Sequence, residues 1–248
     1  MPSPTPKEYP PGSLRQRARI LKGQYLNHRF ERTSPIPPLP RDAIDDVLSV
    51  EVVLPPGRLL MAPGTQPTEG LLFLASLARR LEAKTVFEIG TFTGLTSWTL
   101  ARNLDGAQVH TLDIPPDEVA AFELEDSDGF HPSTSTPMAY ESIPLRGGSV
   151  TQHWSDSARF DFSPWTRAVD LVYVDGAHSD GYVRSDSKNA FAMIGDDGAV
   201  VWDDYWRLSP GVSRTLNAMA SERPLYRVPG TRLVVFFAPA ARTRFLNY

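Results

Sequence analysis

The chain has 248 residues, which is long enough for one large α/β domain and short for a second independent core. Its 25 basic and 29 acidic side chains give a formal net charge of −4, and no basic cluster could follow a phosphate backbone, so we expect no nucleic acid partner. The absence of cysteine excludes disulfides, thiolate metal ligands and a thiol nucleophile. The sequence shows neither a secretory signal nor a membrane-spanning apolar run, so we expect a cytoplasmic protein without a membrane partner.

Residues 1–62 form a proline-rich arm, in which prolines are densest over residues 35–40. Sustained periodicity is absent, and we predict one or two short helices. The arm either covers the active site, contacts a partner subunit of a homo-oligomer, or is a mobile tail. The domain itself is predicted over residues 63–248.

From Thr68 onward the pattern becomes regular. Leu71, Leu74 and Ala78 recur at helical spacing, which predicts a helix that lies on a sheet. Short runs rich in β-branched and aromatic residues then alternate with longer helical runs, and this alternation predicts a parallel, doubly wound sheet. The predicted strands are residues 85–89, 108–112, 150–154, 169–174 and 199–202.

Two further strands are predicted at residues 225–228 and 233–237, separated only by residues 229–232. A link this short permits only an antiparallel hairpin. The sequence therefore predicts an α/β fold with a Rossmann-like, doubly wound, mostly parallel seven-stranded sheet that ends in a C-terminal antiparallel hairpin. Residues 115–149 are rich in proline, serine and acidic side chains and are longer than an ordinary connection, so they form either a lid or a partly disordered surface loop.

The strongest local signal is at residues 86–94, where an apolar strand runs into a glycine turn and the start of a helix. Gly90 lets the backbone turn without a Cβ, and Gly94 lets a helix and a ligand approach closely. Glu88 can accept hydrogen bonds from a cationic ammonium group. About twenty residues on, Asp113 follows the second predicted strand, where an acid can bind the two ribose hydroxyls of an adenosine.

A dinucleotide fingerprint would place further glycines at the second and fifth positions after Gly90, but Phe92 and Leu95 stand there. The sequence therefore disfavours an NAD-dependent dehydrogenase. Absence of NAD binding would exclude that function.

The run Glu88-Ile-Gly90-Thr-Phe-Thr-Gly94 resembles the first motif of class I S-adenosylmethionine-dependent methyltransferases, in the O-methyltransferase branch that includes catechol and macrolide-sugar enzymes. Residues 153–157, 174–178 and 202–205 resemble later motifs of the same family, and the similarity covers about residues 63–237. The resemblance implies that cofactor-binding residues are Glu88, Gly90, Thr91, Gly94 and Thr96 around the methionine end, Asp113 at the ribose, and Asp156 and Ser157 at the adenine. Residues 155–157 are equally suited to cap a helix.

Four polar side chains, Asp175, His178, Asp203 and Asp204, follow the fourth and fifth predicted strands and should share one edge of the sheet. Three carboxylates that close repel one another unless a cation, a donor or a proton compensates, which indicates a divalent ion. The resemblance implies that Asp175, Asp203 and Asp204 would ligate the metal. Hard oxygen ligands suit Mg²⁺, with Ca²⁺ or Mn²⁺ as alternatives.

The pair Asp203-Asp204 departs from the catechol-type pattern, which has Asp-Asn there, so metal dependence stays open. Neighbouring residues of a strand point to opposite faces, and the two carboxylates can converge only if the strand has already ended. A metal-free alternative is that one of them binds the acceptor or caps the following segment.

His178 lies three residues after Asp175, where catechol-type enzymes have a lysine general base. A neutral imidazole, with an unperturbed pKa near ~6.5, can take the proton of an acceptor hydroxyl. We expect His178 and Asp175 to be catalytic, with Asp175 also touching the cofactor, although His178 is equally able to open the next helix. Tyr205 and Trp206 are expected near the substrate.

The predicted function is that of an S-adenosylmethionine-dependent O-methyltransferase, a metal-assisted transferase of natural-product biosynthesis that methylates a sugar hydroxyl or a phenol. Because the sulfonium is already a strong methyl donor, the protein mainly aligns the reactants. One alternative is a metal-independent methyltransferase of an amine or carboxylate. Another is a non-catalytic protein that binds S-adenosylmethionine as a ligand.

Overall fold

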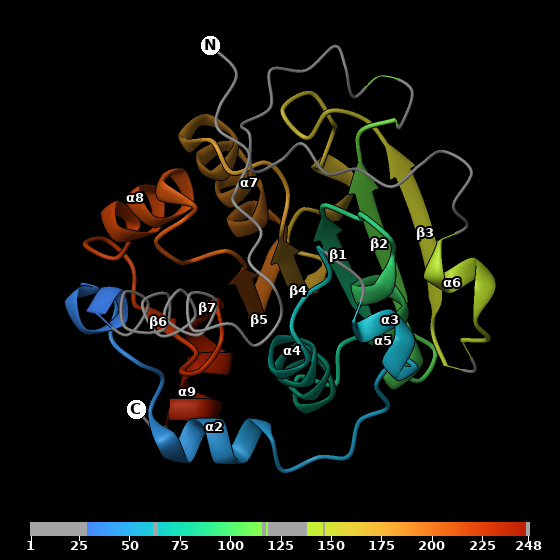
Figure 1. The fold of residues 1–248 in the computed structure, drawn as a ribbon, viewed down its shortest axis with the longest axis horizontal. Helices are drawn as coiled ribbons and strands as arrows, with labels where there is room; N and C mark the ends of the chain where they lie inside the picture. The colour runs from blue at the N-terminus through green and yellow to red at the C-terminus, as the bar shows by residue number, and fades with distance from the viewer. Residues whose placement is uncertain (1–28, 62–63, 116–117, 119–137, 146, 247–248) are drawn as a thin grey trace, which may run out of the picture.

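The computed structural model describes residues 29–61, 64–115, 118, 138–145 and 147–246. Its centre is a seven-stranded sheet with the order β3-β2-β1-β4-β5-β7-β6 (Figure 1). Strands β1 to β5 pair in parallel, and β7 lies antiparallel between β5 and β6, which confirms the predicted sheet. The strands are β1 (Thr85–Ile89), β2 (Gln108–Asp113), β3 (Ser149–Trp154), β4 (Val169–Val174), β5 (Ile194–Trp202), β6 (Leu225–Arg227) and β7 (Val234–Phe237).

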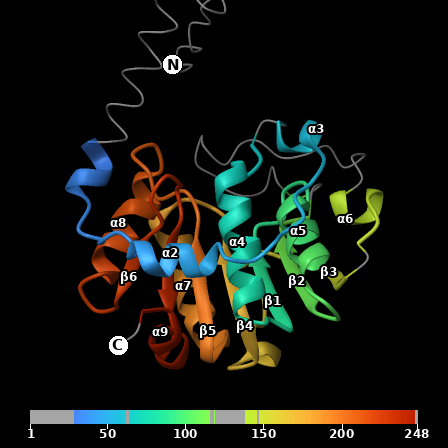
Figure 2. The same ribbon diagram turned by 90° about the horizontal axis from the view of Figure 1, so that it is seen from below.

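Helices cover both faces of the sheet. Figures 1 and 2 show α2, α4, α5 and α9 on one face and α7 and α8 on the other. The helices are α2 (Arg41–Val47), α3 (Gly57–Leu60), α4 (Thr68–Arg80), α5 (Leu95–Asn103), α6 (Ala139–Ser142), α7 (Asp180–Met193), α8 (Pro210–Met219) and α9 (Pro239–Leu246), with a 3-10 turn η3 (Ser163–Trp165). None of the helices in the described residues is long and apolar enough to cross a membrane.

Most residues of the central strands β1 and β4 are apolar because helices cover both of their faces. Side chains of a strand alternate between faces, so Val86 packs in the core under α4 and α5 while Phe87 packs in the core under α7. The same alternation turns Glu88 toward α5, on the face that carries Val86. This direction of Glu88 becomes important for the site.

Five strand boundaries differ from those predicted, and in two of them the strand is one residue longer: β2 ends at Asp113 and β3 begins at Ser149. β5 begins at Ile194 because Val169 pairs with Ile194 before an irregularity whose extra residues lie in β5, and the regular register starts at Leu171 and Ala199. β6 ends at Arg227, since the N–H of Val228 donates to the carbonyl of Leu233 and closes the hairpin turn. That closure also delays β7 to Val234.

The described part of the arm holds three short helical segments, residues 29–33, α2 and α3, which is more than the one or two predicted. Pro40 and Pro56 are the N-caps of α2 and α3, so these prolines start helices and do not only interrupt them. The backbone of Leu39 donates to Arg227 over 2.8 Å, which docks the arm on β6. Residues 1–28 and most of the predicted lid lie outside the described residues.

Candidate active site

A cavity of about 570 Å³ opens at the carboxyl ends of β1, β2, β4 and β5. This is the edge where an open parallel sheet binds its ligands. The predicted site residues that line it are Gly90, Asp113, Asp156, Ser157, Asp175, His178, Asp203 and Asp204. Four other predicted residues, Glu88, Thr91, Gly94 and Thr96, are not among its lining residues.

Gly90 forms the turn after β1 and tolerates no side chain. Its φ is +99°, and a Cβ built on it would lie 2.0 Å from the carbonyl oxygen of Asp175. The N–H of Gly90 donates to Leu112 and the N–H of Asp175 donates to Ile89, each over 2.8 Å. The turn after β1 therefore rests directly on the backbone of Asp175.

Asp113 holds the shape of the same turn. One carboxylate oxygen accepts the backbone N–H groups of Thr91 (3.1 Å) and Phe92 (2.9 Å), and the other accepts that of Ile114 (2.8 Å). A carboxylate offers about four acceptor sites. Asp113 can thus keep these contacts and still accept hydrogen bonds from a ligand in the cavity that it lines.

Glu88 lies beneath the turn and away from the cavity. Its carboxylate accepts hydrogen bonds from the hydroxyls of Ser97 and, over 2.7 Å, of Thr111. Burial, partly offset by these hydrogen bonds, raises the pKa of Glu88 to about 8. Thr91 belongs to the same buried network, since its hydroxyl lies 2.7 Å from that of Thr111. In this structure both residues support the turn from inside.

Gly94 and Thr96 lie at the start of α5, outside the cavity lining. Gly94 is the N-cap with φ 70°, and a Cβ there would meet the ring of Tyr140 at 2.6 Å. Thr96 is buried in the first turn of the helix. Gly94 therefore lets α5 approach the ring of Tyr140 in α6.

Asp156 and Ser157 line the cavity on the side of β3. The carboxylate of Asp156 accepts the N–H of Ala158 over 2.9 Å and lies 3.6 Å from the guanidinium of Arg159. No helix of the described residues begins there, since a turn and then η3 follow β3, so the helix-cap alternative is wrong. Asp156 instead closes a turn at the rim of the cavity.

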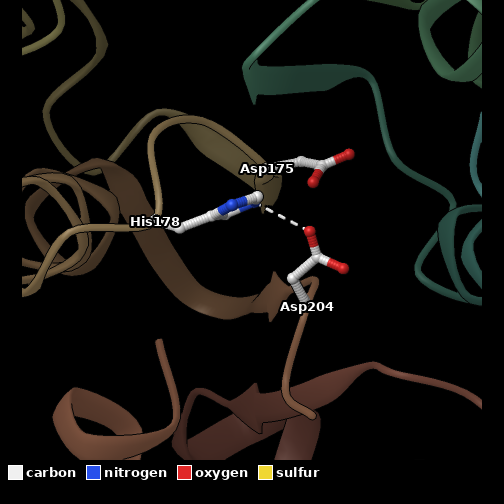
Figure 3. Close-up of side chains that lie close together, drawn as sticks. All are labelled: Asp175, His178 and Asp204. Carbon is white, nitrogen blue, oxygen red and sulfur yellow. Dashed lines mark ion pairs between the residues drawn. The ribbon is translucent and has the colours of Figure 1, made fainter. Parts of the chain in front are cut away.

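The acidic residues Asp203 and Asp204 lie beyond the end of β5. β5 ends at Trp202, and Asp204 has a φ of 55°, with its N–H donating to a carboxylate oxygen of Asp203 over 2.6 Å. The two side chains then part. Asp203 is buried, whereas Asp204 turns to His178, whose Nε2 lies 2.7 Å from Asp204 Oδ2 (Figure 3).

Tyr173, near the carboxyl end of β4, contacts two of the acidic residues. Its hydroxyl lies 3.0 Å from Asp175 Oδ2 and 3.1 Å from Asp203 Oδ2, and it accepts a hydrogen bond from Gln66 over 3.0 Å. One hydroxyl hydrogen is thus shared by two carboxylates. An aromatic residue inside an apolar strand is typical of core packing, so the sequence indicated no functional role for Tyr173.

The carboxyl groups of Asp175, Asp203 and Asp204 repel one another, and nearby positive charge does not fully compensate. Burial, and then the charges of Asp203 and Asp204, raise the pKa of Asp175 well above its usual value. Burial and the charge of Asp204 raise the pKa of Asp203 to about 6, against the opposing effect of Arg232. A cation near this group of acids would therefore be stabilised.

Arg232 supplies a cation that sequence reasoning missed. Its Nη1 lies 2.9 Å from Asp204 Oδ1 and its Nη2 lies 3.8 Å from Asp203 Oδ2. The guanidinium also lies over the ring of Trp206, 5.2 Å from the centroid. The sequence offered Arg232 only as a link residue of the predicted hairpin, and it is the antiparallel pairing of β5 with β7 that places Arg232 beside the carboxyl end of β5.

One ligand atom each from Asp175, His178 and Asp204 lies within 4.8 Å of the others, a spacing that could hold a metal ion. Figure 3 shows the imidazole and the Asp204 carboxylate turned toward each other, with Asp175 beside them. In the described residues this group contains His178 in place of the predicted Asp203. The reason is that Asp203 turns into the protein, toward Tyr173.

Of the two aromatic residues expected near the substrate, only Trp206 is among the lining residues of the cavity. Trp206 lines the cavity, together with Leu208 and Ser209. Tyr205 is buried, and its hydroxyl binds Asn217 over 2.7 Å and shares a 2.6 Å hydrogen bond with Ser34 of the arm. Tyr205 therefore fastens the arm to the segment that follows Asp204.

Residues 87–205 match a family model described as a methyltransferase domain. A search among curated proteins finds no match to this sequence. Among solved structures, a methyltransferase from Podospora anserina with S-adenosylhomocysteine bound is 15% identical over 94% of this chain and 98% of that chain, with a TM-score of 0.51.

Two other solved structures are an O-methyltransferase from Bacillus cereus in complex with S-adenosylhomocysteine and the Streptomyces achromogenes O-methyltransferase TomG, involved in tomaymycin synthesis, in complex with S-adenosylmethionine. The first is 17% identical over 86% of this chain and 99% of that chain, with a TM-score of 0.49. The second is 18% identical over 87% and 98%, with a TM-score of 0.48. At such identities likeness concerns the fold alone. The family match therefore indicates a methyltransferase domain over residues 87–205, which run from β1 to the segment just after β5.

Proposed function

We propose that this enzyme transfers the methyl group of S-adenosylmethionine to a hydroxyl group of a small molecule, a natural-product sugar or a phenol. The observation that carries the proposal is the pair formed by His178 and Asp204, with 2.7 Å between Nε2 and Oδ2, at the mouth of the cavity. A histidine that a carboxylate orients is suited to take a hydroxyl proton. Nothing comparable would be needed for binding alone.

The cavity is lined by residues that would contact each part of the cofactor, from the adenine to the sulfonium. Asp156 and Ser157 at its far rim would contact the adenine, and Asp113 would accept the ribose hydroxyls. The turn at Gly90 rests on the backbone of Asp175 and both residues line the cavity, so the sulfonium end of the nucleoside would lie over this turn. This arrangement directs the methyl group toward Asp175 and His178.

In the proposed reaction the acceptor oxygen attacks the methyl carbon in line with the carbon–sulfur bond. The new oxygen–carbon bond forms as the carbon–sulfur bond breaks, and its electron pair leaves with the neutral thioether of S-adenosylhomocysteine. His178 takes the hydroxyl proton, and the carboxylate of Asp204 stabilises the imidazolium that results. Alignment of the reactants in the cavity supplies much of the acceleration.

Assistance by a divalent metal is the second candidate, favoured by the grouping of Asp175, His178 and Asp204 within 4.8 Å. The ion would be Mg²⁺, with Ca²⁺ or Mn²⁺ as alternatives. A bound ion would supply a positive charge that lowers the pKa of an acceptor hydroxyl. His178 would then be a ligand and no longer the base, so the two candidates assign the imidazole different roles.

Calorimetry with S-adenosylmethionine and S-adenosylhomocysteine, followed by a methyl-transfer screen read by mass spectrometry, tests the proposal. The screen contains sugars, phenols, amines and carboxylic acids, each with MgCl₂ and then with EDTA. We expect binding of both nucleosides and a mass gain of one methyl on a hydroxyl compound. Transfer only to amines or acids would contradict the acceptor class, and binding without any transfer would favour a non-catalytic protein.

A further inference from the structure

We propose that Arg232 is the resident cation of the acidic mouth, by which we mean Asp175, Asp203 and Asp204, and that methyl transfer by this chain therefore needs no metal. The inference rests on the proposed function, because it concerns the same mouth. It decides between the two candidates above in favour of the metal-free reaction.

The strand register places Arg232 opposite Asp204. β5 and β7 are antiparallel, and their last pair at this edge is Trp202 with Val234. Continued two residues further, the same register sets Asp204 against Arg232. The two oppositely charged residues thus face each other just where the sheet opens into the cavity.

The backbone fixes Arg232 in that place. Its carbonyl oxygen accepts the N–H of Tyr205 over 2.9 Å. The hairpin turn before it is also closed, since the hydroxyl of Thr231 donates to Val228 over 2.8 Å and accepts the N–H of Leu233 over 3.0 Å. Arg232 is therefore built into the wall of the mouth.

The side chain of Arg232 is held as firmly as its backbone. The guanidinium contacts Asp204 at 2.9 Å and Asp203 at 3.8 Å, and it packs over Trp206. Only 29% of the side chain is exposed, compared with 63% for Arg214 in its surface ion pair with Asp180. A partly buried ion pair is screened less by solvent than a surface pair.

Two of the three acids of the mouth, Asp203 and Asp204, are already engaged by the protein's own groups. Asp204 faces His178 with one oxygen (2.7 Å) and Arg232 with the other (2.9 Å). Asp203 accepts the N–H of Asp204 with one oxygen and the hydroxyl of Tyr173 with the other. A divalent ion on Asp204 would also lie beside a fixed guanidinium, and the two cations would repel each other. With Arg232 in place, a metal would find only Asp175 among the three acids without the Arg232 cation beside it, and we infer that this donor set does not fit a metal.

Electron paramagnetic resonance with Mn²⁺ as the probe tests the inference without an acceptor. The wild-type protein should bind no Mn²⁺ at equimolar concentration. With an acceptor found in the screen above, EDTA should change its methyl-transfer rate by less than twofold. In Arg232→Met the mouth loses its cation, so we expect a new site for one Mn²⁺. The further substitution Asp204→Asn should remove that site.

Two variants serve as controls. Arg232→Lys retains a positive charge and should gain no Mn²⁺ site, and Arg214→Met breaks a surface ion pair and should behave as the wild type. Stoichiometric Mn²⁺ binding by the wild-type protein would overturn the inference even if Arg232→Met does not fold. S-adenosylhomocysteine calorimetry on the same samples separates the two hypotheses: no nucleoside binding by the wild type contradicts the proposed function, whereas Mn²⁺ binding contradicts the role of Arg232.

Discussion

Two regions of the cavity wall use polar residues in different ways. In the turn after β1, Glu88, Thr91 and Asp113 bind other groups of the protein, and only Asp113 of the three lines the cavity. In the acidic mouth, Asp175, Asp203 and Asp204 all line the cavity, and His178 lines it beside them. The first region comes from two adjacent strands, whereas the second needs loops from β4, β5 and the β6–β7 hairpin. Shape is thus built locally, and the reactive groups are assembled from distant parts of the chain.

The largest effect is expected where a polar residue of the first region is buried. The pKa of Glu88 is raised from 4.5 to about 8, so the folded state keeps a proton that the unfolded state loses, and stability falls as pH rises through this range. Each pH unit contributes about 1.4 kcal/mol, which amounts to a loss on the order of 5 kcal/mol. Glu88→Gln should abolish this loss in chemical denaturation between pH 5 and pH 8, a range taken from that shift.

The exposed Glu69, changed to Gln, is the matched control and should leave the pH dependence of the wild type. If Glu88 instead bound the cofactor ammonium directly, Glu88→Gln would weaken S-adenosylhomocysteine binding and leave the pH dependence of unfolding unchanged. That result would remove the contrast between the two regions.

In the acidic mouth the largest expected effect is on rate. His178→Ala should lower kcat by about 10²–10⁴-fold, because the acceptor proton loses its base, while the affinity for S-adenosylhomocysteine should change little. His153, which pairs with His110 at 3.2 Å and does not line the cavity, is the control. Retention of the wild-type rate in His178→Ala would show that another group takes the proton.

The contact between the two regions is tested at Gly90. Gly90→Ala would force a Cβ to within 2.0 Å of the Asp175 carbonyl, and we expect a loss of about 3 kcal/mol in the free energy of unfolding. Gly106 also has a positive φ, of 67°, but has open space around it, so Gly106→Ala should cost only about 1 kcal/mol. Equal losses in denaturant titrations of the two variants would mean that the close approach is unimportant.

The smallest effect is expected at the arm. Ser34→Ala removes the 2.6 Å hydrogen bond to Tyr205, which directly follows Asp204, and should cost about 1 kcal/mol of stability. Thr33→Ala, in an exposed neighbour that bonds only within its own helical turn, is the control. Thermal denaturation of both variants measures the difference. Equal stability of the two variants would mean that the hydrogen bond from Ser34 to Tyr205 does not stabilise the attachment of the arm.

The sheet and the location of the site followed from the sequence because they depend on repeating patterns. Alternation of strand and helix specifies a parallel sheet, and a parallel sheet specifies the edge at which Asp175, His178 and Asp204 meet. The end of β5 at Trp202 likewise followed from the short β-rich run at residues 199–202. Each of these arguments needs only the order of residues along the chain.

The partners of individual side chains did not follow, because they depend on register and direction. Glu88 points toward α5, where Ser97 satisfies its carboxylate, and this follows from strand alternation only once the faces of the sheet are known. Arg232 was visible only as a link residue of the hairpin, since its contact with Asp204 depends on the β5–β7 pairing. Nothing in the apolar run of β4 indicated that the hydroxyl of Tyr173 contacts Asp175.

The reversed direction of β7 gives the protein a separate place from which to adjust its chemistry. A connection of only a few residues, at the far end of the sheet order from β2 and β3, reaches the atoms where the methyl group would move. Substitutions in that connection would alter the charge felt by the acceptor without disturbing the nucleoside pocket. Evolution, or an engineer, could thus change acceptor preference there while cofactor affinity stays constant.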